Sequence, residues 1–342
     1  MTIKILHGDC IEQMKTMDDE SVDCVVTSPP YWGLRDYGVD GQIGLEATLD
    51  EHLEKMVEVF EEIKRILKPT GTVFLNYGDC YASTPNGRKA KDVENDDRCF
   101  RDKPMSTVGG VLKPKDLCMI PNRLAIALQC AGWWVRSEII WAKPNPMPES
   151  VTDRPAQSHE KIFLLTKSPR YFYDAEAVRK PAADASIKRW DQDIENQTGS
   201  TRANGGKKTN GNMKAVGGRT REVPPRNKGY KNHTTLNEVP TGHGRNLRNY
   251  EPAPVQVWEF ATRPFKEAHF ATFPPELAER CIKAGCPQGG VVFDPFGGAG
   301  TTGLVADRLG LDAVLIELND DYIDIASKRI VDDNPMFAEV VA

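Results

Sequence analysis

The sequence predicts an α/β fold, a parallel β-sheet covered by helices and interrupted by an irregular basic insert. Three observations support this prediction. Short runs of β-branched and apolar residues alternate with segments of helical periodicity along most of the chain. A glycine-rich turn near the C-terminus joins one such run to a helix. Residues 181–250 have almost no apolar periodicity and are rich in Gly, Asn, Lys and Arg.

The chain before residue 180 predicts alternating strands and helices. Residues 49–67 carry apolar side chains at helical spacing, and Lys68, Pro69 and Gly71 end that helix. Runs of β-branched and apolar residues that end in turn residues predict strands. These strands span residues 3–9, 22–28, 71–79, 134–143 and 160–168, and a second helix spans 121–133. Residues 81–116 are polar and irregular, with little periodicity.

After the insert, ordered structure is expected to resume over residues 254–260. Strands are then expected over 289–296 and 312–318, with helices over 274–285, 301–310 and 320–331. Because strands and helices alternate on both sides of the insert, we expect one domain with a parallel sheet. This domain is formed by residues 1–180 and 251–342, and residues 181–250 are inserted in it.

The charge is distributed unevenly along the chain. The net charge is −5, but residues 181–250 hold 13 Lys and Arg against 6 Asp and Glu, a net of +7. The remainder therefore carries −5 − 7 = −12. A basic segment within an acidic body predicts a polyanionic partner. The insert is also expected to be partly disordered when no partner is bound.

The composition also limits the compartment and the cofactors. The sequence has no run of 18 apolar residues and no secretory pattern at its start, so we expect a cytoplasmic protein without a membrane partner. Its eight cysteines include no C-x-x-C pair. We therefore expect free thiols and no metal site.

The stretch VVFDPFGGAGTTGLVADRLGLDAVLIEL, residues 291–318, is the most informative motif. A strand ends at Asp294, a glycine-rich turn leads into a helix, and a second strand ends at Glu317, 23 residues further on. This βαβ spacing predicts a nucleotide site in which Glu317 meets ribose hydroxyls. A carboxylate at the strand end disfavours a phosphate and suits a cationic amino-acid group, as in S-adenosylmethionine. The alternative is a purely structural turn.

The stretch TSPPYW, residues 27–32, follows another apolar strand. Two consecutive prolines end that strand and hold Tyr31 and Trp32 on a stiff loop. Together, TSPPYW and DPFGGAGTT resemble the S-adenosylmethionine-dependent DNA amino-methyltransferases, in the permuted motif order of the beta group. The resemblance covers about residues 3–80, 117–175 and 254–330. It implies a Rossmann-like class I methyltransferase sheet with helices on both faces.

The resemblance assigns the catalytic tetrad to Ser28, Pro29, Pro30 and Tyr31. The Ser28 side chain and the Pro29 carbonyl would orient the exocyclic amine of a flipped base, and Tyr31 would stack on that base. In this family, Ser at the first position is typical of enzymes that methylate the 4-amino group of cytosine. Asp is typical of enzymes that methylate the 6-amino group of adenine. We therefore expect cytosine, with adenine as the alternative.

The resemblance also implies the residues that bind S-adenosyl-L-methionine. HFATFPPELAERCI, from residue 269, is similar to the segment before the glycine motif, and ILHGDC, from residue 5, to the strand whose carboxylate faces the adenine. The expected cofactor-binding residues are Asp9, Cys10, His269, Phe270, Thr272, Asp294, Pro295, Phe296, Gly298, Gly300, Thr301, Glu317 and Asn319.

The expected partner is double-stranded DNA, recognised through residues 181–250, with or without a companion restriction endonuclease. Three other functions compete. Methylation of cytosine carbon-5 needs a cysteine nucleophile, usually in Pro-Cys, a dipeptide absent from this chain. Glutamine amide methyltransferases carry Asn-Pro-Pro-Tyr after the cofactor motif, whereas here Ser-Pro-Pro-Tyr precedes it. An inactive nucleic-acid-binding protein would not need the intact motifs.

Several residues keep two interpretations. Tyr31 and Trp32 could stack on a base or pack locally, and Asp9 could face the cofactor or cap a turn. The pair His159-Glu160 could serve structure or function. Arg35 and Asp36 could form an ion pair or contact the DNA backbone.

Overall fold

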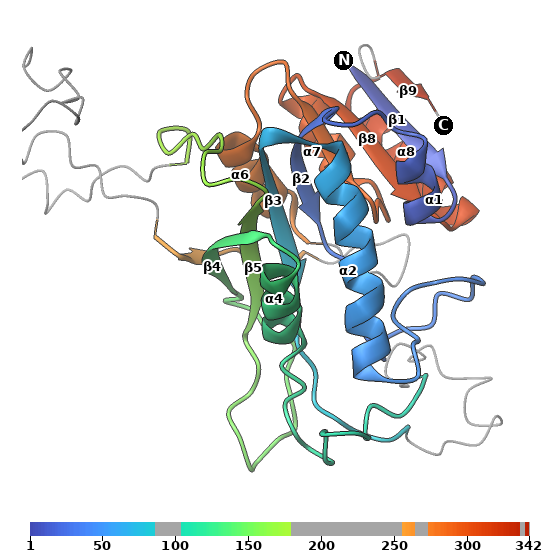
Figure 1. Cartoon of the computed structure of the whole chain (residues 1–342), viewed down its shortest axis with the longest axis vertical. Helices are drawn as coiled ribbons and strands as arrows, with labels where there is room; N and C mark the ends of the chain where they lie inside the picture. The colour runs from blue at the N-terminus through green and yellow to red at the C-terminus, as the bar shows by residue number, and fades with distance from the viewer. Residues whose placement is uncertain (86–103, 179–254, 264–272, 336–338, 342) are drawn as a thin grey trace, which may run out of the picture. The chain divides into compact units, whose positions relative to one another are not determined.

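Nine strands form one sheet in the part of the chain that the computed structural model describes, residues 1–85, 104–178, 255–263, 273–335 and 339–341. In chain order they are β1 Thr2–His7, β2 Val22–Thr27, β3 Leu67–Tyr77, β4 Trp134–Ala142, β5 His159–Thr166, β6 Val257–Glu259, β7 Val291–Asp294, β8 Asp312–Glu317 and β9 Glu339–Val341. The order across the sheet is β6-β4-β5-β3-β2-β7-β8-β1-β9. The predicted α/β fold is confirmed (Figure 1).

The direction of one strand differs from the expected parallel sheet. β5 pairs antiparallel with both β3 and β4, while the other neighbouring strands pair parallel. An antiparallel pair needs only a short connection, so β4 and β5 are joined by a loop without a crossover helix. The apolar runs of these strands do not encode direction, which is why the sequence left this reversal undetected.

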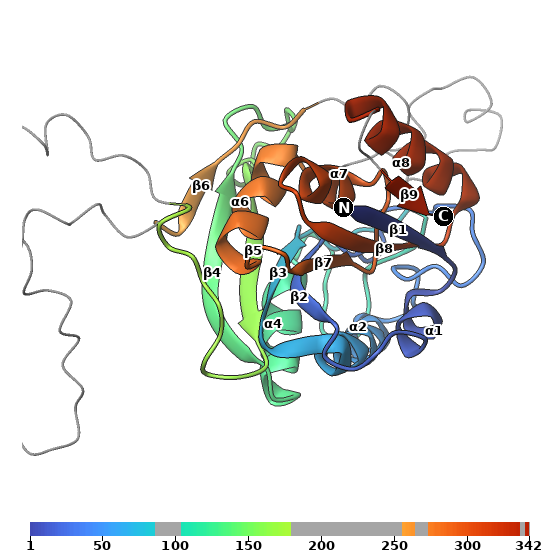
Figure 2. The same cartoon turned by 90° about the horizontal axis from the view of Figure 1, so that it is seen from above.

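Helices cover both faces of the sheet, as Figure 2 shows from above. The helices are α1 Cys10–Lys15, α2 Leu49–Ile66, α4 Ile120–Cys130, α6 Pro275–Gly285, α7 Thr301–Arg308 and α8 Asp320–Asp333. α1, α2 and α4 pack on one face, and α6, α7 and α8 pack on the other. Each set buries its apolar side chains against the sheet, so the core consists of two layers.

Helix α2 illustrates how the sequence sets the element boundaries. Thr48 and Glu51 form a capping box at its start, in which each side chain bonds the other's backbone amide. The buried face includes Met56, Phe60 and Ile63. The helix ends at Ile66, and β3 begins at the next residue instead of at residue 71. The predicted helix over 49–67 is therefore confirmed to within one residue.

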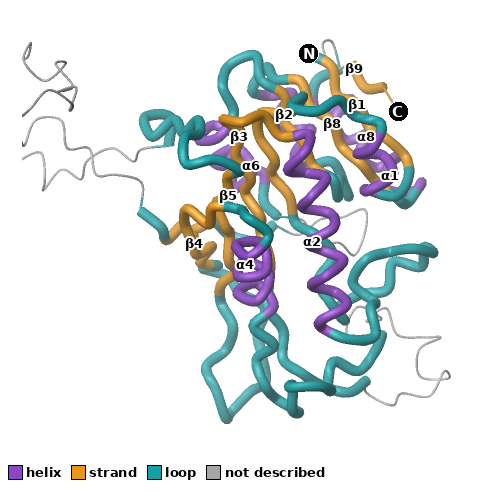
Figure 3. The backbone as a smooth tube through the Cα atoms, in the orientation of Figure 1, coloured by secondary structure: helices purple, strands orange, loops and turns teal. Residues whose placement is uncertain are grey.

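The carboxyl ends of β2, β7, β8 and β1 meet at one edge, because these four strands are adjacent and parallel. Figure 3 shows long irregular loops beyond the same end of β3, beneath the start of α2. The described parts of residues 81–116 contain only the isolated bridges Tyr81 with Leu117 and Gly109 with Leu112, consistent with the irregular segment expected there. The insert at 181–250 lies outside the described residues.

Among the helices in the described ranges, none has the length and apolar character required to span a bilayer.

Candidate active site

A pocket of about 150 Å³ lies at the carboxyl ends of β1, β2, β7 and β8. This edge is where open α/β sheets bind their ligands. Eleven of the predicted site residues line the pocket: Asp9, Cys10, Ser28, Pro30, Asp294, Pro295, Phe296, Gly298, Thr301, Glu317 and Asn319. Two motifs that are more than 260 residues apart in the chain therefore share one cavity.

Asp294, at the end of β7, is the most deeply buried carboxylate of the pocket, with 1% of its surface exposed. Its Oδ1 accepts a hydrogen bond from the Phe296 amide at 3.1 Å, and its Oδ2 accepts one from the Thr302 hydroxyl at 2.7 Å. Burial raises the pKa of Asp294 to about 7, because removal from water disfavours the ionised form. A cationic group in the pocket would offset this cost.

Glu317, at the end of β8, organises the glycine turn. Its two carboxylate oxygens accept hydrogen bonds from the amides of Gly298 at 2.7 Å and of Leu318 and Asn319 at 2.9 Å each. Burial raises the pKa of this carboxyl group. An ionised carboxylate has about four acceptor sites. Three are used by the protein, which leaves one for a ligand hydroxyl.

Two other polar residues of the pocket also cap helices. The Asp9 side chain is the N-cap of α1 and accepts from the amides of Ile11 and Glu12, so the capping interpretation is correct. Asn319 is the N-cap of α8 and accepts from the amide of Asp321. Both residues also line the cavity, and the capping hydrogen bonds fix their positions there.

Ser28 connects the pocket to a polar cluster behind it. Its hydroxyl lies 3.4 Å from the Tyr31 hydroxyl, which donates to Glu160 Oε2 at 2.9 Å. The amide nitrogen of Asn76 contacts the Ser28 hydroxyl, the Tyr31 hydroxyl and Glu160 Oε2 at 3.4, 3.2 and 3.0 Å. Lys143 forms an ion pair with the other oxygen of Glu160. Glu160 therefore contacts the tetrad, which favours the functional interpretation of His159-Glu160.

The Tyr31 ring is held on one side by the sheet. It stacks on Tyr77 with a centroid distance of 4.8 Å and an interplanar angle of 26°. Gly78 makes this approach possible, since a Cβ atom there would lie 2.5 Å from the Tyr31 ring. One face of the Tyr31 ring is therefore covered by Tyr77. Trp32 is 3% exposed and packs in the core, as its packing interpretation predicted.

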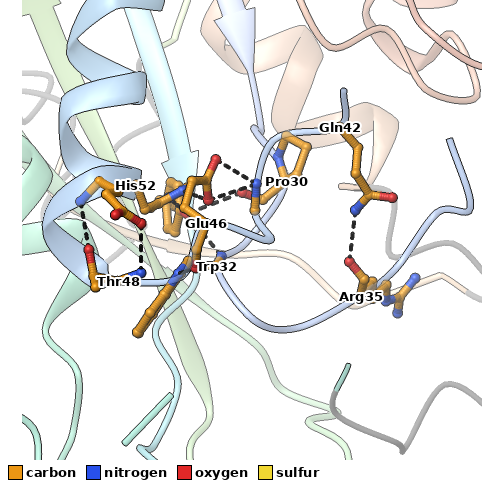
Figure 4. Close-up of polar contacts among 10 residues, drawn as sticks. Pro30, Trp32, Arg35, Gln42, Glu46, Thr48 and His52 are labelled. Atoms are coloured by element: carbon orange, nitrogen blue, oxygen red, sulfur yellow. Dashed lines mark hydrogen bonds and ion pairs between the residues drawn. The ribbon is translucent and has the colours of Figure 1, made fainter. Parts of the chain in front are cut away.

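A chain of hydrogen bonds supports the loop after the tetrad (Figure 4). His52 contacts Glu46 through Nδ1 and the Tyr77 hydroxyl through Nε2, both at 2.8 Å. The Tyr77 hydroxyl donates to the carbonyl of Pro30 at 3.2 Å, and the Trp32 indole donates to the carbonyl of Glu46. These contacts join the start of α2 to the end of β3 and fix the backbone of the tetrad between them.

Sequence reasoning missed one wall of the pocket, the loop that carries Tyr37, Val39, Gln42 and Ile43. Tyr37 contacts Tyr322 of α8 edge to face at 6.4 Å, so residues from the two halves of the chain close this side together. The loop contains three glycines with positive φ, at positions 38, 41 and 44. These glycines are the sequence feature from which a tightly turning loop could have been predicted here.

Some predicted residues lie elsewhere. Gly300 is the N-cap of α7, with φ of +72°, and a Cβ atom there would lie 2.8 Å from the Cβ of Ala326. The absence of a side chain at Gly300 thus allows α7 and α8 to approach each other closely. Pro29 and Tyr31 are not among the residues that line the cavity, although their neighbours Ser28 and Pro30 are. His269, Phe270 and Thr272 lie outside the described residues, although Phe273 lines the pocket.

No group of three or more His, Cys, Asp or Glu side chains suited to a metal ion occurs within the described ranges. Burial raises the pKa of the Cys10 thiol to about 12, so this pocket cysteine is a protonated, neutral group.

The fold and the pocket define an α/β protein with a βαβ nucleotide-type site at the carboxyl ends of its strands. The model of the N6_N4_Mtase family, described as DNA methylase, matches residues 22–328, and the chain belongs to this family. It is therefore a DNA methyltransferase of the N4/N6 type, and its substrate is DNA.

Individual proteins are similar over nearly the whole chain. The type II methyltransferase M.XycI of Xanthomonas campestris pv. cyanopsidis is 40% identical over 338 residues, 99% of this chain and 91% of the relative. The cytosine-N4-specific PvuII DNA methyltransferase has a TM-score of 0.57 at 15% identity, covering 100% of this chain and 95% of that one. TTHA0409 of Thermus thermophilus, complexed with S-adenosyl-L-methionine, has a TM-score of 0.54 at 21% identity, covering 99% of both chains. The structural likenesses show that the fold is shared.

Proposed function

We propose that this protein is a site-specific DNA methyltransferase that modifies the 4-amino group of a cytosine flipped out of the duplex. The observation that carries the proposal is that Ser28 lines the same pocket as Asp294 and Glu317, which end strands β7 and β8. A serine in this place supplies a neutral hydroxyl to the target amine. An aspartate would be expected for the 6-amino group of adenine, which is the alternative.

The cofactor is S-adenosyl-L-methionine, which supplies a methyl group made electrophilic by its sulfonium charge. The pocket residues fit this molecule. Asp294 provides a buried carboxylate for a cationic group, and Glu317 has one acceptor site left for a hydroxyl. The TTHA0409 complex supports the same assignment, since that protein shares the fold and binds S-adenosyl-L-methionine.

The tetrad then acts mainly by positioning. The lone pair of an exocyclic amine is delocalised into the base, so the amine is a poor nucleophile. Hydrogen bonds from the amine to the Ser28 hydroxyl and the Pro29 carbonyl favour a pyramidal nitrogen with its lone pair directed at the methyl group. Such fixed partners contribute without strong acid–base chemistry. Tyr31 offers the ring face opposite Tyr77 to the flipped base, which offsets part of the unstacking cost.

The target sequence is read by residues 181–250, inserted in a catalytic domain formed by 1–180 and 251–342. The net charge of +7 in this insert supports contacts with the phosphates of double-stranded DNA. The name of the relative M.XycI, a type II methyltransferase, supports a role in restriction–modification, with a companion restriction endonuclease as a partner. Such an enzyme would act in the cytoplasm of a prokaryotic cell or of one infected by a phage that encodes it.

The experiment that tests this function is methyl transfer in vitro. Purified protein is incubated with isotope-labelled S-adenosyl-L-methionine and unmodified duplex DNA, and the DNA is digested to nucleosides for mass spectrometry. The label should appear as N4-methylcytosine. Label in N6-methyladenine would establish the alternative base, and label in 5-methylcytosine or no labelled nucleoside would contradict the proposal.

A further inference from the structure

Two successive hydrogen bonds lead from Ser28 away from the pocket toward one carboxylate. Ser28 donates to the Tyr31 oxygen at 3.4 Å, and Tyr31 donates to Glu160 Oε2 at 2.9 Å. We propose that Glu160 is the acceptor for the proton that the target amine must lose, reached through the hydroxyls of Ser28 and Tyr31. This inference rests on the proposed function, because it concerns the fate of that amine.

The reaction requires such an acceptor. When the nitrogen lone pair forms the new N–C bond, the S–C bond of the donor breaks and its electrons stay on sulfur. The nitrogen is then positively charged and carries one proton too many. Breaking one N–H bond leaves its electrons on nitrogen and restores a neutral methylated amine. A serine hydroxyl is too weakly basic to keep that proton, so Ser28 must pass a proton on.

The orientation of the cluster suits a relay. Because Ser28 donates toward Tyr31, its oxygen can accept the proton of an amine in the pocket. Ser28 then gives its own proton to Tyr31, and Tyr31 gives its proton to Glu160. Neither hydroxyl gains or loses charge overall. Burial beside Glu160 raises the pKa of Tyr31 well above its ordinary value, so Tyr31 remains a neutral carrier.

Asn76 of β3 fixes the geometry of the Ser28, Tyr31 and Glu160 side chains. The residue is 3% exposed, and its amide nitrogen contacts the Ser28 hydroxyl, the Tyr31 hydroxyl and the carboxylate of Glu160. The oxygen of the same side chain is buried and has no hydrogen-bond partner among the described residues. Asn76 therefore acts toward the cluster as a donor, which leaves the two hydroxyl protons free to point along the relay. The 3.4 Å separation at Ser28 is long, as is common for catalytic contacts in ligand-free sites.

Glu160 can both hold the proton and release it. Its Oε1 forms the ion pair with Lys143, which leaves Oε2 for Tyr31 and Asn76. Lys143 balances the charge of the carboxylate before the reaction. The Glu160 side chain is 15% exposed, so the proton can leave to solvent after each turnover.

The test compares Glu160→Gln with wild type in single-turnover methyl transfer. Glutamine keeps an oxygen for Tyr31 and Asn76 but cannot take up a proton. We expect the rate to fall roughly 10²-fold, within the range for a lost acid–base group. The affinities for S-adenosyl-L-methionine and for DNA, measured by calorimetry, should stay within about twofold. Glu160→Asp, which keeps a carboxylate, should recover part of the rate.

Two further variants separate the relay from a role in local structure. In Glu160→Gln, the new side-chain NH2 group could face the Lys143 ammonium, which would place two hydrogen-bond donors in contact. The double variant Lys143→Met with Glu160→Gln removes this contact. It should be as slow as Glu160→Gln alone. Glu138→Gln is the matched control, since Glu138 forms an ion pair with Lys161 at 2.7 Å on the same pair of strands. It should keep the wild-type rate.

The outcomes are distinct. A single-turnover rate within twofold of wild type in Glu160→Gln would overturn the relay. Equal losses of rate and of cofactor or DNA affinity in both variants that carry Glu160→Gln would also overturn it, because Glu160 would then only position Tyr31. If wild type itself methylated no DNA amine, the proposed function would fail instead, before any variant was compared.

Discussion

The Ser28 hydroxyl lies between the pocket and the cluster of Tyr31, Asn76 and Glu160. Since Ser28 follows the last residue of β2, a central strand buried along its whole length, its position is fixed by the sheet. We assign cofactor binding to a different segment, the turn between β7 and α7, although both segments line one pocket. The two activities can therefore be lost independently.

Ser28→Ala should lower turnover strongly and leave cofactor affinity nearly intact. The amine loses a hydrogen-bond acceptor that fixes its geometry, and the loss of one such positioned group typically costs on the order of 10²-fold. Single-turnover methylation and calorimetry with S-adenosyl-L-methionine measure the two effects. Ser21→Ala is the control, because the Ser21 hydroxyl donates to the carbonyl of Asp18 within a local turn. A variant Ser28→Ala with wild-type turnover would exclude this role.

Asp294 should give the ligand-free protein a pH-dependent stability. Its pKa is raised from an ordinary value near 3.8 to about 7, so between these pH values the folded state binds more protons than the unfolded state. The free energy of unfolding should therefore decrease as pH rises from about 4 to about 7 and then level off for this group. Three pKa units correspond to a change on the order of 4 kcal/mol.

Asp294→Asn should remove this decline. An amide there can donate to the Thr302 hydroxyl, which in turn can donate to the carbonyl of Val26, where it already lies at 3.2 Å. The variant should therefore fold and should bind S-adenosyl-L-methionine weakly, because its carboxylate is missing. Urea unfolding between pH 5 and 8, with wild type in parallel, measures the slope. An unchanged slope in the variant would show that another group causes the pH dependence.

At the scale of elements, the approach of α7 to α8 sets the shape of the glycine turn that lines the pocket. Gly300 has a left-handed backbone and packs against Ala326, while its neighbours Ala299 and Thr301 line the pocket. Arg329 of α8 donates to the carbonyl of Ala299 and to the Thr301 hydroxyl, both at 2.9 Å. The position of α8 therefore controls the wall of the pocket.

Gly300→Ala should destabilise the protein more than Gly289→Ala. Both glycines have φ near +70°, so both variants bear the cost of a left-handed alanine, about 1–2 kcal/mol. A Cβ atom at Gly289 meets nothing within 4 Å, whereas one at Gly300 meets the Ala326 Cβ at 2.8 Å. The overpacking should add roughly 1–3 kcal/mol. Urea unfolding measures the difference, and equal effects would mean that the helices can separate freely.

Local pattern predicted the elements that are long or strongly apolar. The helix over 49–67 and the turn after Asp294 follow from periodicity, glycines and spacing, and the structure confirms both elements. Helix α1 was missed because its six residues bury only Cys10 and Met14. Strand β9 was missed because its three residues, Glu339–Val341, are ordered by pairing with β1.

Candidate site residues can be picked out from the sequence where a motif groups them locally. Ser28, Asp294 and Glu317, which line one pocket, could be singled out because each lies at or just after the end of a strand within a motif. The wall formed by Tyr37 and the contact of Glu160 with Tyr31 could not be, because they depend on which segments the fold brings together. Glu317 also binds three backbone amides, a structural role that spacing does not reveal.

At the scale of the whole molecule, catalysis and target recognition are expected to occupy different parts of the chain. Residues 197–249 hold 11 Lys and Arg against 2 Asp and Glu, with Tyr230 as the single aromatic residue. Lys and Arg can meet phosphates, and Arg and Asn can read base edges. The pocket, by contrast, is built entirely from residues before 44 and after 272.

Replacing residues 197–249 by a short Gly/Ser linker should spare cofactor binding and abolish site-specific methylation. DNA affinity should also lose much of its salt dependence, because fewer counterions are released. Calorimetry with S-adenosyl-L-methionine and DNA binding at several salt concentrations measure these effects. If the variant still methylated the original sequence, recognition would have to lie elsewhere, with residues 81–116 as the next candidate.

The central claim, methylation of the cytosine 4-amino group within one sequence, is tested most directly by modification-sensitive sequencing of DNA from a host that expresses the protein. The host must lack DNA methyltransferases of its own. The account predicts N4-methylcytosine at one short recurrent sequence, at nearly every occurrence, and its absence when Ser28→Ala is expressed. N6-methyladenine at a recurrent sequence, with cytosine unmodified, would contradict the claim.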